Sequence, residues 1–300
     1  MTEIMEKIMS LKSEKEAVLL AHHYEPEEVQ AVADFVGDSL ALSRQAASAP
    51  GKRIVFCGVY FMAETAKILS PDKKVLLPEP EAGCPMADMI SAEELRGFQA
   101  GFPGSVTVCY VNSSAAVKAE SDVCCTSSNA VRVVESLPKD KRILFVPDKF
   151  LGGYVKSRTG RDIETWSGFC PTHARITADV VRQARKRHPD ATMLVHPECR
   201  PEVIALADAA LSTGQMIEYA EKSPARAFLI GTEKGILTQL GKKCPGKAFH
   251  LLSKDILCPN MKKITLEKIL FSLEHDAGEV KVDDGIAKRA KKAIDAMLVL

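Results

Sequence analysis

Residues 17–24 read AVLLAHHY, a short apolar run that ends in polar and aromatic side chains. The same pattern recurs as VTVCYVN at 106–112 and as TMLVHPE at 192–198. Seventeen residues after His22, Tyr110 and His196 stands a small hydroxyl residue, namely Ser39, Ser127 and Thr213. Recurrence at a fixed interval indicates that the chain is built from three copies of one structural unit.

Each unit also leads into a Cys-Pro pair. The cysteines Cys84, Cys170 and Cys258 lie 62, 60 and 62 residues after the ends of the three opening runs. Between these points every unit has two more apolar runs: RIVFCGV and KVLLPEP, RILFVPD and DIETWSG, and AFLIGTE and AFHLLSK. Short apolar runs that alternate with helical stretches are typical of βαβ units on a parallel sheet.

The sequence therefore predicts an α/β fold of three pseudo-threefold-related αβα domains. These Rossmann-like sandwiches with short parallel sheets would surround a central cluster and active site. We expect the first domain to span 1–88 plus 280–300, the second 89–175 and the third 176–279. Amphipathic patterns predict helices over 1–16 and 283–300, and we expect the last helix to return and pack on the first unit.

The composition limits which cellular compartment and which kinds of partner we expect for the protein. The net charge of +1, with 40 basic and 39 acidic residues, gives no sign of a surface for nucleic acid. The start of the sequence has no signal-peptide pattern, and no apolar run reaches the roughly 20 residues of a membrane span, so we expect a cytoplasmic protein without a membrane partner. In that compartment the nine cysteines are expected to be metal ligands, nucleophiles or core residues rather than disulfides.

Only three of the nine cysteines share one position in the repeat, and these are Cys84, Cys170 and Cys258. We expect packing roles for Cys57, Cys109, Cys124, Cys125 and Cys199, and a turn at Cys244-Pro245. Carboxyl ends of parallel strands face the ligand crevice, so the three repeated cysteines are expected to converge. Three thiolates suit an iron-sulfur cluster or a zinc ion. A cluster is favoured, because structural zinc generally uses local C-x₂₋₄-C pairs and the chain has only a vicinal pair.

A cubane-type iron-sulfur cluster held by three cysteines keeps one iron without a protein ligand, and such an iron is a Lewis acid. Ser39, Ser127 and Thr213 are each expected at a helix N-terminus, where backbone N–H groups attract carboxylates or phosphates. Polar residues at the ends of the first strands form a candidate binding and acid–base set: His22, Tyr24, Tyr110, Asn112, His196 and Glu198. Dehydration of a small anionic substrate is the chemistry that this set favours.

The chain resembles the quinolinate synthase family along essentially its whole length. The matching stretches are LLAHHYEPEEVQAVADFVGDSL, GVYFMAETAKIL, CPMADM, VCYVNSSAAVKAESDVCCTSSNAV, GFCPTH, LVHPECRPEV, STGQM and CPNMKKITLEKI. The resemblance implies three αβα domains that each give one cysteine to a [4Fe-4S] cluster. It also implies condensation of iminoaspartate with dihydroxyacetone phosphate to quinolinate, phosphate and water in de novo NAD biosynthesis.

Site roles follow from the same resemblance, residue by residue. Cys84, Cys170 and Cys258 match the cluster ligands. The substrate-binding positions are matched by His22, Ser39, Tyr110, Asn112, Ser127, His196, Glu198 and Thr213. Catalytic roles are expected for Tyr24, Glu198, His22 and His196, with Tyr24 and Glu198 as the proton-transfer pair. Relatives often have Asn where this chain has His23. The C-x-x-C that some relatives carry near the C-terminus is missing, so thiol regulation of that type is not expected.

Two alternatives stay open at this stage. A diphthamide-synthesis protein has a similar architecture but performs radical chemistry on S-adenosylmethionine, and the polar strand ends argue against it. A non-enzymatic iron-sulfur sensor is the other, although the sequence shows no partner-binding surface. For the enzyme, L-aspartate oxidase or aspartate dehydrogenase would be the source of iminoaspartate.

Overall fold

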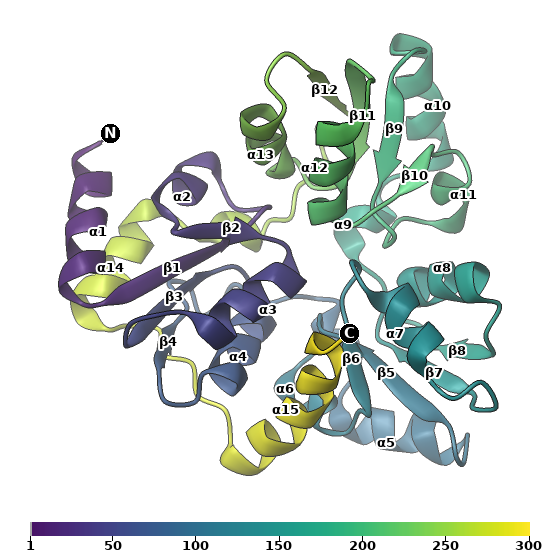
Figure 1. The fold of residues 1–300 in the computed structure, drawn as a ribbon, viewed down its shortest axis with the longest axis horizontal. Helices are drawn as coiled ribbons and strands as arrows, with labels where there is room; N and C mark the ends of the chain where they lie inside the picture. The colour runs from purple at the N-terminus through teal and green to yellow at the C-terminus, as the bar shows by residue number, and fades with distance from the viewer. Residues whose placement is uncertain (1) are drawn as a thin grey trace.

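The computed structural model describes residues 2–300, which form three lobes around a common centre (Figure 1). Each lobe holds a four-stranded sheet, and the strand order is the same in all three. In every sheet the first strand lies between the second and the third, and all pairings are parallel. The prediction of an α/β fold with three αβα units is confirmed.

The first sheet consists of β1 (Ala17–His22), β2 (Phe35–Gly37), β3 (Arg53–Cys57) and β4 (Lys74–Leu76). The second consists of β5 (Val106–Tyr110), β6 (Val123–Cys125), β7 (Ile143–Val146) and β8 (Ile163–Thr165). The third consists of β9 (Thr192–Val195), β10 (Ala209–Ala210), β11 (Ala227–Gly231) and β12 (Ala248–Leu251). Each sheet has one strand more than the three apolar runs indicated, and the additional strands are β2, β6 and β10.

Helices cover these sheets. The first unit has α1 (Glu3–Glu14), α2 (Glu27–Val32), α3 (Ser39–Ser48) and α4 (Tyr60–Leu69). The second has α5 (Ala92–Ala100), α6 (Ala115–Ala119), α7 (Ala130–Ser136) and α8 (Lys149–Thr159). The third has α10 (Ala178–Arg187), α11 (Pro201–Ile204), α12 (Thr213–Lys222) and α13 (Ile236–Lys243). The helix expected over 1–16 is α1, although Met1 lies outside the described residues.

Two of the three hydroxyl residues begin a helix as expected, since α3 starts at Ser39 and α12 at Thr213. Ser127 does not, and that expectation was wrong. Helix α7 begins three residues later, at Ala130, and the Asn129 side chain accepts a hydrogen bond of 2.8 Å from the Thr126 backbone N–H. This bond closes a turn around Ser127, and the helix starts after the turn.

The C-terminal helix α15 (Asp284–Leu298) joins the first two units. It packs mainly on α6 and β6 of the second unit and also contacts α4 of the first. The expectation that it would pack on the first unit therefore needs correction. Helix α6 is only five residues long, and the buried side chains Ala290, Ile294 and Met297 of α15 cover the sheet beside it. The first and second units consequently share one hydrophobic core, whereas the third has clusters of its own.

The segment before α15 also returns to the first unit. Helix α14 (Leu266–His275) packs against α1 and β3, although we expected residues up to 279 to lie with the third unit. The return is fixed by backbone hydrogen bonds, from Val280 to Val75 and from Leu77 to Gly278. The other domain boundaries drawn from the sequence stay predictions.

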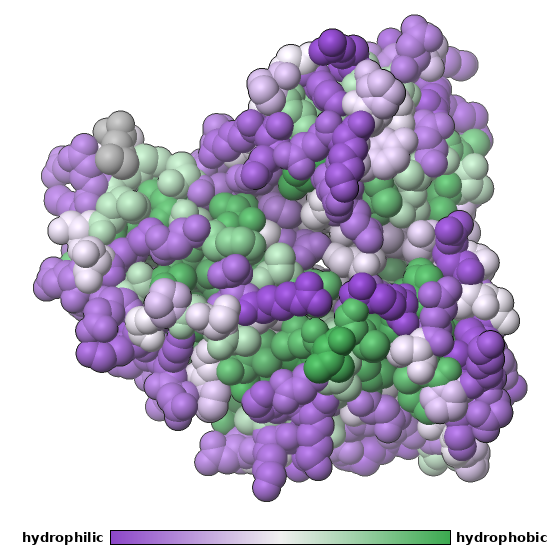
Figure 2. Space-filling model, viewed as in Figure 1, coloured by the Kyte–Doolittle hydropathy of each residue, from purple (hydrophilic) through white to green (hydrophobic). Residues whose placement is uncertain are grey.

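The seam between the first and third units is open at the surface. A groove there is lined by Phe35, Asp38, Gly214 and Ile217, among others, and Figure 2 shows the surface indented between these two lobes. Below the seam, Ser128 of the second unit hydrogen-bonds Asp38 of the first and Ser212 of the third. Among the described residues, no helix is long and apolar enough to cross a membrane.

Candidate active site

A cavity of about 200 Å³ lies where the three units meet, and all three contribute to its wall. Every site residue selected from the sequence lines it: His22, Tyr24, Ser39, Cys84, Tyr110, Asn112, Ser127, Cys170, His196, Glu198, Thr213 and Cys258. The fold thus brings together residues that are up to 236 positions apart in the chain. Their roles in binding and catalysis stay predictions.

Strand ends place the polar side chains in this cavity. His22 and Tyr110 are the last residues of β1 and β5, and His196 directly follows β9. In each sheet the chain first turns to one side of the first strand and then crosses to the other. A ligand crevice forms outside the carboxyl ends of the strands at such a reversal. Three equivalent crevices therefore face one another.

Three equivalent loops place the cysteines. Each Cys-Pro pair is followed by a short helical turn, namely η1 (Ala87–Met89), α9 (Pro171–Ala174) and η2 (Met261–Lys263). In each turn, the backbone N–H of the third residue after the cysteine donates to the sulfur: Ala87 to Cys84, His173 to Cys170, and Met261 to Cys258. Such N–H···S bonds are a normal surrounding for cluster-ligating thiolates.

Burial raises the pKa of the Cys84 thiol to about 12, and it also raises the pKa of Cys170 and of Cys258. By themselves these groups would be neutral thiols, and a bound cation is what would hold them as thiolates. The remaining cysteines are buried, line no part of this cavity, and form no disulfide within residues 2–300. Cys244 lies at the end of α13, which agrees with a turn position. The donor set and its N–H···S bonds therefore fit a cluster held by three cysteines.

Two of the three histidines that line the cavity, His22 and His196, have the same tautomer. The backbone N–H of Tyr24 donates to Nδ1 of His22 at 3.2 Å, and that of Glu198 donates to Nδ1 of His196 at 3.3 Å. Since Nδ1 accepts in both rings, Nε2 carries the proton. Burial lowers the pKa of His196 to about 4 and holds the pKa of His22 well below its ordinary value. Both rings are thus neutral N–H donors at pH 7.

Glu198 is one of two buried glutamates in the cavity wall, and the other is Glu233. Its Oε1 accepts from the Tyr110 hydroxyl at 2.6 Å, and its Oε2 lies 2.7 Å from Nδ1 of His173. Burial alone would raise the pKa of Glu198, but His196, His173 and the Tyr110 hydrogen bond together hold that pKa below its ordinary value. The side chain is therefore ionised at neutral pH although it is only 3 % exposed.

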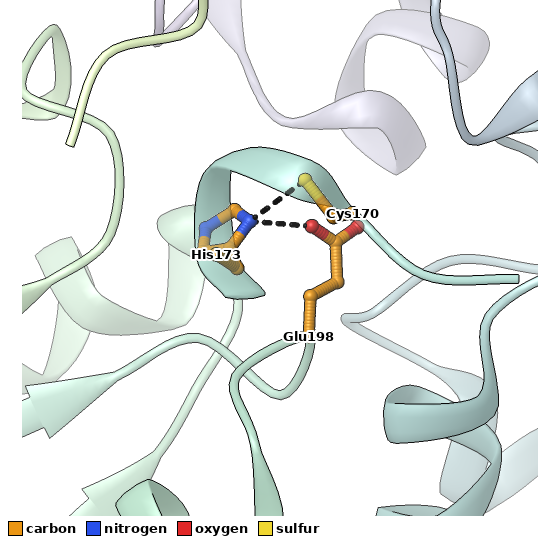
Figure 3. A group of neighbouring side chains, drawn as sticks. All are labelled: Cys170, His173 and Glu198. Carbon is orange, nitrogen blue, oxygen red and sulfur yellow. Dashed lines mark hydrogen bonds and ion pairs between the residues drawn. The ribbon is translucent and has the colours of Figure 1, made fainter. Parts of the chain in front are cut away.

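His173, which was not predicted from the sequence, lies within this network (Figure 3). Ligand atoms of Cys170, His173 and Glu198 all lie within 4.8 Å of one another, so these three side chains could also hold a metal ion. The other ring nitrogen of His173, Nε2, lies 2.8 Å from the hydroxyl of Thr232. The only signal in the sequence was the stretch GFCPTH, in which His173 stands three residues after Cys170. The equivalent positions of the other two units hold Ala87 and Met261.

A further cavity residue that the sequence did not indicate is Arg175. Arg175 lines the cavity from an exposed position, and it is the only lysine or arginine among the described lining residues. The carbonyl oxygen of the Asn112 side chain is buried and has no hydrogen-bond partner, while its amide nitrogen lies 3.5 Å from Glu198. An unpaired acceptor in a cavity wall is suited to bind a ligand N–H or O–H group.

The comparison with known families identifies the chain. Residues 6–299 match the family model described as quinolinate synthetase A protein. The chain belongs to this family. It is 55 % identical to the quinolinate synthase of Dehalococcoides mccartyi, over 98 % of this chain and 97 % of the relative. It is 54 % identical to the quinolinate synthase of Methanoregula boonei, over 99 % and 98 %. Membership makes the chain an enzyme, and it confirms the resemblance seen in the sequence.

The same comparisons argue against the two alternatives. Another quinolinate synthase, from Caldicellulosiruptor saccharolyticus, is 51 % identical over 99 % of this chain. A match to this enzyme family over nearly every residue accounts for all three units at once. Neither a diphthamide-synthesis protein nor a sensor is therefore needed to explain the site.

Proposed function

We propose that the protein is a quinolinate synthase that condenses iminoaspartate with dihydroxyacetone phosphate to give quinolinate, phosphate and water. The observation that carries this proposal is the convergence of three equivalent Cys-Pro loops on a cavity with neutral histidine donors and one ionised glutamate. The reaction would serve de novo NAD biosynthesis in the cytoplasm.

The proposed cofactor is a [4Fe-4S] cluster held by Cys84, Cys170 and Cys258. When bound, such a cluster would supply one iron without a protein ligand, which acts as a Lewis acid on a substrate carboxylate or hydroxyl. The three N–H···S bonds support this ligand set, because they stabilise each sulfur as a thiolate.

Both proposed substrates are anions, and the cavity offers several donors to them. His22 and His196 present Nε2–H groups, while Ser39 and Thr213 stand at the N-termini of two ten-residue helices. Thr213 is further held by His23, whose Nδ1 lies 2.9 Å from its hydroxyl across the seam between units. We propose that these groups bind the carboxylates and the phosphate, with Asn112 as an acceptor for a substrate N–H or O–H.

Ring formation requires protons to be removed and returned. Glu198 is suited to act as a base, because it is ionised although its side chain is buried. We assign the complementary role to Tyr24, whose hydroxyl lies in the same cavity wall. Burial, and then the charge of Glu198, raise the pKa of Tyr24 well above its ordinary value, so Tyr24 reaches the substrate as a neutral phenol.

Iminoaspartate is an imine and hydrolyses in water, so a second enzyme must supply it close to its use. We propose an L-aspartate oxidase or an aspartate dehydrogenase as that source. No nucleic acid or membrane partner is proposed.

The test is quinolinate formation by protein prepared without oxygen, supplied with dihydroxyacetone phosphate and freshly generated iminoaspartate. We expect product that requires both substrates, and its loss after exposure of the protein to air. Absence of product from anaerobic protein shown to contain iron and sulfide would contradict the proposed function.

A further inference from the structure

Two cysteines that the proposed function does not use face each other in the sheet of the second unit. Cys109 of β5 and Cys124 of β6 are directly paired in the register of these parallel strands, so their side chains lie on the same face of the sheet. Both side chains are fully buried, and a hydrogen bond connects the two sulfur atoms. Cys109 and Cys124 thus form a buried dithiol that lines no part of the central cavity.

The spacing of this pair suits a disulfide bond. Neighbouring strands of a sheet lie about 4.7–4.9 Å apart, and the Cα atoms of disulfide-bonded cysteines lie about 4.4–6.8 Å apart. The adjacent Cys125 provides a comparison within the same strand, because successive side chains of a strand point to opposite faces. Cys124 can therefore reach Cys109, whereas Cys125 cannot.

A buried lysine lies beside the dithiol. Lys118 of α6 has 0 % of its surface exposed, and its Nζ donates to the Ser113 carbonyl and lies 5.3 Å from the centre of the Phe61 ring. None of the ion pairs within residues 2–300 includes Lys118. A buried ammonium without a counter-charge is costly, so its surroundings must supply negative charge. Two nearby groups can do so, namely the Glu64 carboxylate and the Cys109 thiolate.

The two thiols of the pair differ in acidity. Burial raises the pKa of Cys109, but the hydrogen bond from Cys124, the charge of Lys118 and the hydroxyls of Ser113 and Ser121 together lower it to about 7. The same bond raises the pKa of Cys124 well above its ordinary value. At neutral pH Cys109 is therefore partly ionised, and Cys124 is a neutral thiol. Since the thiolate is the form that oxidants attack, the pair has one reactive and one resolving member.

We propose that Cys109 and Cys124 form an oxidation site for hydroperoxides, in which the Cys109 sulfur reacts first and Cys124 resolves the product to a disulfide. With hydrogen peroxide, the Cys109 thiolate attacks one oxygen and the O–O bond breaks, which gives a sulfenic acid and one hydroxide ion. The Cys124 sulfur then attacks the Cys109 sulfur, and its proton leaves with the sulfenic oxygen as water. The two sulfurs together lose two electrons, and the peroxide gains them.

The last helix of the chain covers this oxidation site. Helix α15 packs on β6, which carries Cys124, and on α6, which carries Lys118 (Figure 1). Terminal elements open locally at a lower cost in free energy than core strands. Hydrogen peroxide is little larger than water, so a local opening of α15 is enough to admit it.

The strands that carry the dithiol also place residues in the central cavity. Tyr110 directly follows Cys109 and ends β5, while Ser127 stands three positions after Cys124. A disulfide requires Cβ atoms about 3.5–4.5 Å apart, which is less than the spacing of neighbouring strands, so it draws β5 and β6 together. Oxidation at this site is therefore expected to displace Tyr110 and Ser127 and to weaken substrate binding.

Peptide mapping tests the oxidation site without measuring turnover. The iron-loaded protein is treated with hydrogen peroxide, its free thiols are alkylated under denaturing conditions, and cleavage after Glu120 separates Cys109 from Cys124. We expect mass spectrometry to show the two peptides joined in wild type and in Cys125→Ser, but not in Cys124→Ser. In Cys124→Ser, Cys109 should remain a sulfenic acid that dimedone traps. Absence of the joined peptides from wild type, or their loss in Cys125→Ser, would overturn the proposal.

A second variant tests the role of the lysine. Lys118→Met keeps the length of the side chain and removes its charge, so the thiolate fraction of Cys109 should fall. We expect dimedone labelling of Cys109 after peroxide to be about fivefold to tenfold slower in Lys118→Met/Cys124→Ser than in Cys124→Ser. An unchanged rate would remove Lys118 from the site. If the protein forms no quinolinate, the proposed function fails, and these labelling experiments still decide whether the dithiol is an oxidation site.

Discussion

The Tyr110 hydroxyl lies 2.6 Å from Oε1 of Glu198, although the two residues are 88 positions apart and belong to different units. This bond connects the second unit to the third inside the cavity. It also contributes to the low pKa of Glu198, together with His173 and His196. The side chains that keep the proposed base ionised therefore come from separate parts of the sequence, and no single local motif contains them.

Loss of this bond should change the pH dependence of the reaction. Tyr110→Phe removes a donor to the carboxylate, so the pKa of Glu198 should rise, by about one unit for a lost charge-assisted hydrogen bond. A base with a higher pKa becomes protonated at higher pH. We therefore expect the acidic limb of kcat/KM to move to higher pH, measured as quinolinate formation across the pH range. An unchanged acidic limb would show that Glu198 is not the group that titrates.

The contact between Gly235 and Tyr24 gives a steric test across the seam of the first and third units. A Cβ at Gly235 would lie 2.7 Å from the backbone carbon of Tyr24, whereas one at Gly241, in the same helix region, meets nothing within 4 Å. Gly235→Ala should displace Tyr24 and lower kcat about tenfold to 100-fold. Gly241→Ala should leave turnover intact and stabilise α13 by about 0.5–1 kcal/mol. Equal turnover of the two variants, with equal Tm, would contradict this account of Tyr24.

The C-terminal return is fixed by an ion pair whose effect depends on pH. Asp276 lies 2.9 Å from Arg53 and 2.9 Å from Lys74, and the hydrogen bond from Arg53 is the main reason that the pKa of Asp276 is lowered to about 2. Because the pKa is lower in the folded state, the stabilisation is present above the unfolded value of about 3.9 and is lost as the pH falls towards 2.

Asp276→Asn should accordingly destabilise the protein by about 1 kcal/mol at pH 7, since the pair is partly exposed and screened. Asn also tolerates the left-handed backbone that Asp276 adopts, with φ of 52°, so the change is electrostatic. Denaturant unfolding at pH 7 and at pH 3 checks this, with the exposed Asp179→Asn as control. A difference from wild type that does not shrink at pH 3 would point to packing instead of charge.

The repeat made much of the site predictable. Equal intervals located Ser39, Thr213 and the three cysteines, because each interval spans the same strand and helix lengths in every unit. The start of α7 was not predictable in this way, since Ser127 lies in a turn that the Asn129 side chain closes on the Thr126 backbone N–H. Departures of this kind arise where one unit differs from the other two.

Other features depend on contacts that no sequence pattern carries. An amphipathic helix such as α15 fits any uncovered sheet, and the short α6 decides which one it covers. His173 and Thr232 have no counterpart of similar chemistry in the other units, so the repeat gave no reason to select them. Their partners Glu198 and Tyr24 are 25 and 208 positions away along the chain and become neighbours only through packing of the units.

The central claim is that the cysteines at one repeat position hold a cluster on which turnover depends. The third unit contains a matched pair for this test, since Cys258 and Cys244 both precede proline but only Cys258 lines the cavity. We would measure bound iron and quinolinate formation in anaerobic Cys258→Ser and Cys244→Ser. The account predicts loss of iron and activity in Cys258→Ser, and wild-type values of both in Cys244→Ser. Full iron and activity in Cys258→Ser would contradict it.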